Sequence, residues 1–398
     1  MPRLTSDPIL DPRLKLASEL YHGGRLGEAL AHAESLWSDG PPTAALTVLL
    51  GELRLLANRL DAAAPLLRAA LDERPGHPRL TGLWAELERR RGHWRSAAAA
   101  LVSLGRTACA AQLDALARTG AGRLPPGWSA PRIAWIERDP VPTIEVRVGD
   151  RIAHMLLDTG IGDTLLDRDL AHRLDLQSFG GEAIHFPAGP PGRVEYAILP
   201  RLGLGPLDLE GVPVQVMPLR ETFAGLIERP VDGILGLGLL SRFHSRLDGH
   251  DGRLCLTRPE RPGPGVPFYW AGEHYALVEA RIDDRLDTLL FLDTGMVGAA
   301  FRITPAMAEH AGLESGATRT HAGFAIAHQL AARPVRAQAI EAAGARRERL
   351  DGMLVAAFRL ERAFGFRVSG LLGQDFIAGG SLDLDLAHMR VSLTAPSH

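Results

Sequence analysis

The chain has 398 residues, a net charge of −3 and a pI near 6.6, with 46% apolar and 23% charged residues. This length predicts two to three domains, and the charge balance gives no reason to expect nucleic acid or an anionic membrane as a partner. There is no apolar run of membrane-spanning length, no signal-peptide pattern, and only two distant cysteines, so we expect a cytoplasmic protein with reduced thiols.

The first third repeats with a period of 34 residues. Small residues recur in two registers, Gly24, Asn58 and Gly92, and then Ala29, Ala63 and Ala97. Pro41 and Pro75 keep the same spacing and would end a helix, because proline lacks the backbone N–H. The pattern predicts an all-α repeat domain of stacked helix pairs over residues 1–122.

This region resembles the tetratricopeptide repeat over about residues 10–118. The resemblance implies a surface for a partner protein, with a helical cap that only shields the neighbouring domain as the alternative. Residues 123–142 are rich in glycine and proline and are expected to form a linker, in which Trp128 and Trp135 pack against something. The charge run at residues 88–91 is interpreted as a solvated face.

Beyond residue 142 short apolar runs alternate with turn residues, which predicts β-structure. The unit occurs twice, and we place its copies at residues 143–260 and 261–398. In each copy an apolar strand leads into Asp-Thr-Gly, at 158–160 and 293–295, and an apolar-apolar-Gly element follows about 75 residues later. The elements are Ile234, Leu235 and Gly236 in the first copy and Leu371, Leu372 and Gly373 in the second.

The duplicated unit resembles the pepsin and retropepsin superfamily of aspartic peptidases, and is closer to its retropepsin-like branch. The resemblance implies an all-β bilobal double barrel with one active site per chain, in which Asp158 and Asp293 are catalytic. It assigns support of the two loops to Thr159, Gly160, Thr294 and Gly295. It assigns the two apolar-apolar-Gly elements to packing behind the loops.

Two carboxyl groups held about 3 Å apart cannot both ionise, so such a pair shares one proton. The ionised member takes a proton from water and the protonated member donates to the substrate carbonyl, without metal or cofactor. We therefore expect an aspartic endopeptidase that hydrolyses a protein or peptide. The sequence does not assign acid and base to the two residues.

Ile161 and Met296 follow the two Asp-Thr-Gly motifs, where the family usually has Ser, Thr or Ala. Neither side chain donates a hydrogen bond, so we expect a raised dyad pKa and a pH optimum shifted toward mildly acidic or near-neutral values. The same residues leave a second reading open, a degenerate site that binds peptide without cutting. A third is a dimer in which lobes pair between chains; a monomer is the simpler expectation.

Flap hairpins are required to cover a substrate. The candidate turns contain Gly189 and Gly192 in the first copy and Gly323 and Phe324 in the second. Tyr196 is expected to be a cross-strand packing residue, and Asp248 with Asp385 to serve turns or strand ends. The fifteen histidines show no metal-ligand spacing, so no metal site is expected.

Overall fold

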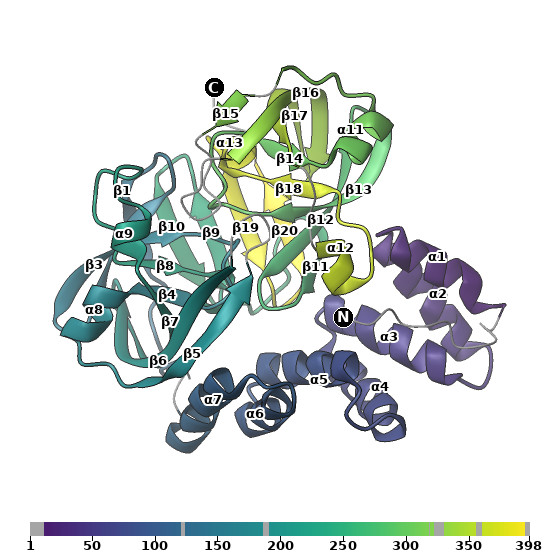
Figure 1. Cartoon of the computed structure of the whole chain (residues 1–398), viewed down its shortest axis with the longest axis horizontal. Helices are drawn as coiled ribbons and strands as arrows, with labels where there is room; N and C mark the ends of the chain where they lie inside the picture. Colours follow the sequence, from purple (N-terminus) through teal and green to yellow (C-terminus); the bar gives the residue numbers. More distant parts are fainter. Residues whose placement is uncertain are drawn as a thin grey trace.

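The computed structural model describes residues 12–120, 124–185, 191–317, 319–321, 330–355 and 360–394. An arc of helices lies along one side of two β-rich lobes (Figure 1). Among the described residues, no helix is both long and apolar enough to cross a membrane.

The helical region contains seven described helices. They are α1 (Leu14–His22), α2 (Leu26–Ser38), α3 (Ala44–Leu56), α4 (Leu60–Glu73), α5 (Pro78–Arg90), α6 (Trp94–Ser103) and α7 (Thr107–Thr119). α2, α4 and α6 begin at Leu26, Leu60 and Trp94, so the second helix of each pair keeps the 34-residue period.

Local chemistry explains this period. Gly24, Asn58 and Gly92 all have positive φ angles, between 52° and 80°, at the turn inside each pair, and only glycine or asparagine adopts that conformation readily. Ala29, Ala63 and Ala97 are all fully buried, which lets neighbouring helices approach closely.

The described residues of the first lobe form ten strands and three short helices. They are β1 (Arg132–Glu137), β2 (Thr143–Val148), β3 (Arg151–Leu157), β4 (Thr164–Asp167), α8 (Arg168–Arg173), β5 (Ser178–His185), β6 (Pro191–Leu204), β7 (Leu207–Met217), α9 (Leu219–Thr222), β8 (Gly233–Leu235), α10 (Leu237–Leu240), β9 (His244–Asp248) and β10 (Arg253–Thr257).

The second lobe repeats this order element by element. It contains β11 (Val266–Ala271), β12 (Tyr275–Ile282), β13 (Leu286–Leu292), β14 (Phe301–Ile303), α11 (Pro305–Ala311), β15 (Arg319–His321), β16 (Leu330–Ala342), β17 (Ala345–Leu354), α12 (Leu360–Phe364), β18 (Gly370–Leu372), α13 (Gln374–Ile377), β19 (Ser381–Asp385) and β20 (Arg390–Leu393).

One boundary differs from the sequence expectation. Part of the expected linker is β1, which pairs with β2 and β10 just as β11 pairs with β12 and β20. Residues 132–137 therefore belong to the first lobe. The surrounding prolines and glycines hid a short strand, and one of its two pairing partners, β10, is distant in sequence. Trp128, also in this segment, packs edge-on against Phe243 at 5.4 Å between ring centroids.

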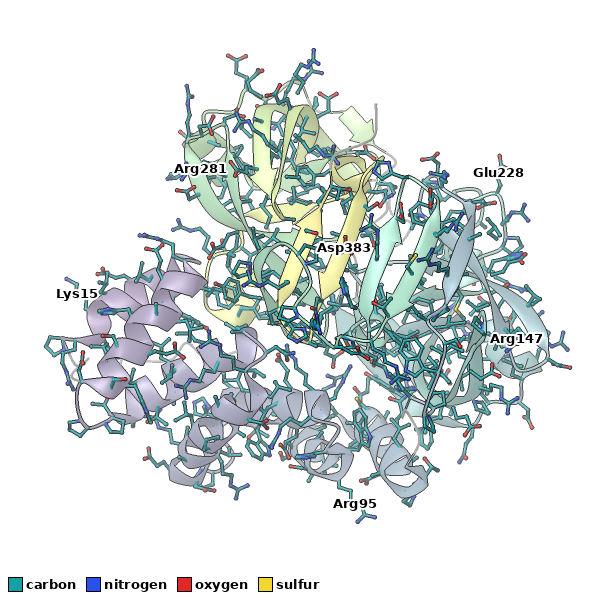
Figure 2. All side chains as sticks on the ribbon, turned by 180° about the vertical axis from the view of Figure 1, so that it is seen from behind. Lys15, Arg95, Arg147, Glu228, Arg281 and Asp383 are labelled. Carbon is teal, nitrogen blue, oxygen red and sulfur yellow. The ribbon has the colours of Figure 1, made fainter. Side chains whose placement is uncertain are left out.

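A six-stranded antiparallel sheet joins the lobes in the order β1–β10–β9–β19–β20–β11. Asp383 of β19 lies at its centre, opposite Arg246 of β9 (Figure 2). Asp248 accepts from the backbone N–H groups of His250 and Asp251, and Asp385 accepts from those of Gly263 and His388. Both aspartates thus stabilise turns at strand ends.

The inner side of the helical arc packs on both lobes. Buried residues of α1–α4 share a hydrophobic cluster with β11, β12 and β13 of the second lobe. Residues of α5–α7 share another with β3, β4 and β6 of the first lobe. Lys15 and Arg95 point away from the lobes on the outer side of the arc (Figure 2). The helices therefore hold the two lobes from one side.

Candidate active site

Each Asp-Thr-Gly loop begins where a central strand ends. In the first lobe β8 lies between β3, which it pairs with in parallel, and β4, which it pairs with antiparallel. In the second lobe β18 lies in the same way between β13 and β14. The N–H of Asp158 donates to Leu235 O at 3.1 Å, and that of Asp293 donates to Leu372 O at 2.9 Å. The apolar-apolar-Gly elements thus fix the first residue of each loop.

The two threonines bind the loops to each other. Thr159 Oγ1 donates to Leu292 O at 2.8 Å and accepts from the N–H of Thr294 at 3.0 Å. Thr294 Oγ1 donates to Leu157 O at 3.0 Å and accepts from the N–H of Thr159 at 2.9 Å. Both threonines are fully buried, so these four hydrogen bonds form without competition from water.

The glycines bring the carboxyl groups together. The N–H of Gly160 donates to Asp158 Oδ1 at 2.7 Å, and that of Gly295 donates to Asp293 Oδ1 at 3.0 Å. A methyl group on Gly160 would overlap the Asp293 carboxyl group, and one on Gly295 would overlap that of Asp158. Each carboxyl group therefore occupies space that a side chain on the opposite loop would need.

Both aspartates have raised pKa values. Burial raises the pKa of Asp158 well above 3.8, and the negative charge of Asp293 raises it further. Burial also raises the pKa of Asp293, while its hydrogen bond with Asp158 and the charge of Arg302 act in the opposite direction. The side chains lie within hydrogen-bonding reach of each other, and the arrangement favours one proton shared between them.

The glycines of the packing elements leave room for the loops. A methyl group on Gly236 would lie 2.7 Å from the carbonyl oxygens of Ile161 and Gly162, and one on Gly373 would lie 2.6 Å from that of Met296. The next residue of each element donates to the same loop, Leu237 N–H to Ile161 O at 2.8 Å and Gln374 N–H to Met296 O at 2.7 Å.

Ile161 and Met296 pack into the apolar interior. Met296 is 1% exposed and belongs to the cluster shared by α1–α4 and the second lobe. Ile161 is partly buried against the cluster shared by α5–α7 and the first lobe. The residues that replace hydroxyl donors therefore lie where the helical region covers the loops. Burial is the main cause of the raised carboxyl pKa values.

The flap candidates lie mostly outside the described residues, which include Gly192 and exclude Gly189, Gly323 and Phe324. Gly192 is in β6, opposite Ile184 of β5. β15 and β16 pair in the same antiparallel way in the second lobe. Tyr196 of β6 is fully buried and faces the helical region, where its hydroxyl accepts from Arg106 at 2.7 Å.

A cluster of charged side chains joins the helices to both lobes, and sequence reasoning did not find it. We name it the interdomain cluster; its members are Arg89, Arg106, Asp163, Glu182 and Glu273. Arg89 binds Asp163 at 2.8 Å and Glu273 at 2.9 Å, and Arg106 binds Glu273 at 3.1 Å and Glu182 at 3.0 Å. Burial favours the neutral acid, but the charges of Arg89 and Arg106 prevail and lower the pKa of Glu273 to about 2.

The interdomain cluster reaches the segment after the first Asp-Thr-Gly loop and strand β5. Asp163 lies five residues after Asp158 and also accepts from Gln215 at 3.1 Å. Glu182, on strand β5, accepts from the N–H groups of Ala108 and Cys109 at 3.0 Å each, at the N-terminus of α7. A carboxylate at that position satisfies unpaired N–H groups and complements the helix dipole.

The interpretation of residues 88–91 as a solvated face was wrong. Glu88 is 4% exposed, and the side chain of Arg90 is 5% exposed. Arg90 lies over the Trp270 ring at 4.1 Å and donates to Trp270 O at 2.9 Å. Arg90 thus contacts the second lobe and Arg89 binds both lobes, and the only sequence signal for this was the run itself.

Among the residues the structure describes, no group of three or more His, Cys, Asp or Glu side chains could hold a metal ion. A cavity of about 2370 Å³ lies between the inner side of α3–α7 and the two lobes. Its lining includes Arg89, Asp163 and Glu273 but neither Asp158 nor Asp293. The cavity is therefore separate from the dyad.

Comparisons with known proteins agree with the first lobe. A family model described as aspartyl protease matches residues 144–239, a segment that holds the first Asp-Thr-Gly loop and its packing element. A search of curated proteins found no match. Residues 144–239 of the first lobe are thus similar to the aspartyl protease family.

Two solved structures also match parts of this chain. A retropepsin-like aspartic protease from Rickettsia conorii is 20% identical over 33% of this chain and 90% of its own, with a TM-score of 0.23. Basic 7S globulin from soybean is 11% identical over 67% of this chain and 94% of its own, with a TM-score of 0.42.

Proposed function

We propose that the chain is an aspartic endopeptidase in which Asp158 and Asp293 activate a water molecule for attack on a peptide bond. The observation that carries the proposal is the reciprocal binding of the two loops through Thr159 and Thr294, which brings both carboxyl groups to one centre. A carboxyl pair that shares a proton supplies both a general base and a general acid without a metal.

Both loops come from the same chain, so a single chain supplies the complete dyad. We propose the monomer as the working unit and the paired lobes as the double barrel of the pepsin and retropepsin superfamily. The free cysteines Cys109 and Cys255 fit a reducing compartment, and a cytoplasmic location is part of the proposal.

The helices are proposed to be a tetratricopeptide-like array with two roles. Their inner side packs on both lobes, which supports the role of a cap that holds the lobes in register. The cavity between the array and the lobes, lined by arginine and aromatic side chains, supports recruitment of a protein substrate or partner.

Digestion of a peptide library tests the proposal, with wild type compared with Asp293→Asn. Wild type is expected to cut and the variant to lose cutting, because a dyad without one carboxyl group cannot hold a base and an acid together. Unchanged folding of the variant, measured by circular dichroism, is the control. Cleavage that persists in Asp293→Asn would exclude the dyad.

The apolar residues Ile161 and Met296 favour a second candidate, a peptide-binding adaptor without turnover. Binding of a pepstatin-like transition-state mimic separates the two, because an active dyad binds such a molecule much more tightly than substrate. Peptide binding without mimic binding or cleavage would favour the adaptor.

A further inference from the structure

The two lobes differ at one buried position beside the dyad. β4 of the first lobe and β14 of the second are equivalent, since β4 pairs antiparallel with β8 and β14 pairs antiparallel with β18, the strands of the apolar-apolar-Gly elements. Leu165 lies opposite Ile234 in the first lobe, and Arg302 lies opposite Leu371 in the second. Leu165 is 3% exposed and Arg302 is 2% exposed. An apolar side chain in one lobe is thus replaced by a buried guanidinium in the other.

The strand pairings place these two residues near the start of each Asp-Thr-Gly loop. In the first lobe, Leu165 lies across from Ile234, which lies across from Leu156, two residues before Asp158. In the second lobe, Arg302 lies across from Leu371, which lies across from Phe291, two residues before Asp293. Cross-strand neighbours share a face of the sheet, so Arg302 lies on the same face as Leu371 and Phe291.

Arg302 has no ion-pair partner within 4 Å among the described residues, and its Nε has no hydrogen-bond partner there. Asp293 is the acidic group whose charge acts on it. Burying an arginine without a close counter-ion costs free energy. The interaction of Arg302 with the charge of Asp293 therefore offers a functional reason for this residue.

We propose that Arg302 is a positioning residue that makes the dyad asymmetric, so that Asp293 carries the negative charge and acts as general base while Asp158 holds the shared proton and acts as general acid. The inference rests on the proposed function, and it assigns the two roles that the symmetry of the loops leaves open.

The other groups that face the dyad agree with this assignment. Asp293 interacts with Asp158, Arg302 and the hydroxyl group of Tyr275, and it accepts from the N–H groups of Gly295 and Met296. Arg302 is the cation in this set. Asp158 interacts with Asp293 and accepts from the N–H groups of Gly160 and Gly295, and no cation is among these groups.

The proton movements follow from the assignment. Asp293 takes a proton from water as the water oxygen bonds to the substrate carbonyl carbon, and Asp158 gives its proton to the carbonyl oxygen. The gem-diol then collapses: Asp293 passes its proton to the amide nitrogen, the C–N bond breaks, and one hydroxyl proton returns to Asp158. The dyad ends with the charge and proton it had at the start.

The first test is the pH dependence of kcat/KM for Arg302→Leu, which copies the first lobe. The acidic limb reports protonation of the ionised carboxylate, so loss of the cation is expected to move that limb up by about 1 pH unit. Arg302→Lys keeps the charge and is expected to restore the wild-type limb. Leu165→Met, at the equivalent position, is the matched control and is expected to leave the limb in place. An unmoved limb in an active Arg302→Leu enzyme overturns the proposal.

The second test needs neither activity nor an arginine variant. Carbon-13 NMR titration follows Asp293 in Asp158→Asn and Asp158 in Asp293→Asn, each without its partner's charge. Asp293 is expected to titrate at the lower pH, because it retains Arg302. The reverse order, or equal titration, overturns the proposal. If wild type cuts no peptide but this order is found, the proposed function fails and the assignment of charge stands.

Discussion

The two lobes share one chain topology but differ in what surrounds it. Their loops, packing elements and threonine hydrogen bonds are related element by element, and the two threonines join the loops by four hydrogen bonds. The first loop is followed by Asp163, which the helical region binds through Arg89. The second is followed by a strand with buried Arg302. The equivalent elements of the two lobes therefore position both aspartates, while Arg89 near the first loop and Arg302 near the second give the aspartates different surroundings.

The largest expected effect is a loss of activity on changing the glycines of the two Asp-Thr-Gly loops, which are equivalent in the two lobes. Gly295→Ala would place a methyl group on the Asp158 carboxyl group, and Gly160→Ala would place one on that of Asp293. We expect each to reduce kcat/KM on a cleaved peptide by at least about 100-fold, because misplaced catalytic groups lose their alignment. The two losses should be similar.

Gly82→Ala is the matched control, since nothing lies within 4 Å of the added methyl group in α5. It should leave activity unchanged and stabilise the helix by about 0.5–1 kcal/mol. If either loop variant kept the wild-type kcat/KM, the prediction that the two loops are equally important would be wrong.

The next effect is a loss of stability on removing the ion pair between Arg89 of the helical region and Asp163, which follows the first loop. Arg89→Met removes one partner from Asp163 and one from Glu273 at a largely buried site, and is expected to lower the free energy of unfolding by about 3 kcal/mol. Urea denaturation measures this. Arg68→Met removes an exposed α4 ion pair with Asp72 and should cost less than about 0.5 kcal/mol. Equal losses would mean that the interdomain cluster adds no stability.

The threonines sharpen the comparison at smaller scale. Thr159→Val and Thr294→Val each remove one buried donor and one buried acceptor, at an expected cost of about 2 kcal/mol. Thermal or urea unfolding should give nearly equal losses for the two. If one variant loses clearly more unfolding free energy than the other, the hydrogen bonds of the two threonines do not contribute equally to stability.

The smallest effect separates the two aspartates through pH. The pKa of Asp158 is raised well above 3.8, so above that pH the folded chain binds more protons than the unfolded chain. Stability therefore falls as the pH rises past 3.8, until the folded-state pKa is passed. Asp158→Asn should remove this loss and stabilise the chain at pH 7 by about 1 kcal/mol, with no gain at pH 3.5.

Asp293→Asn should stabilise less, because it leaves the charge of buried Arg302 without its neighbouring carboxylate. Urea unfolding of both variants at the two pH values measures the difference. A larger gain from Asp293→Asn would contradict the asymmetry between the lobes.

The sequence alone determined features that follow from local or repeated chemistry. The 34-residue period was readable because each helix pair needs a left-handed residue at its turn and a small residue at its contact, as Gly24 and Ala29 show. The meeting of the two Asp-Thr-Gly loops was predictable because a duplicated unit places equivalent residues about one axis.

Only the tertiary structure decided which charges are buried and against what. Arg89, Arg90 and Glu273 look like ordinary surface residues in the sequence, and β1 looks like a linker. For each of them at least one partner lies more than a hundred residues away: Glu273 for Arg89, Trp270 for Arg90, and β10 for β1. Arg302 likewise gives no sequence signal, since its effect depends on strand register beside Asp293. Local periods encode local geometry, whereas the energy of a buried charge depends on the groups that distant segments bring to it.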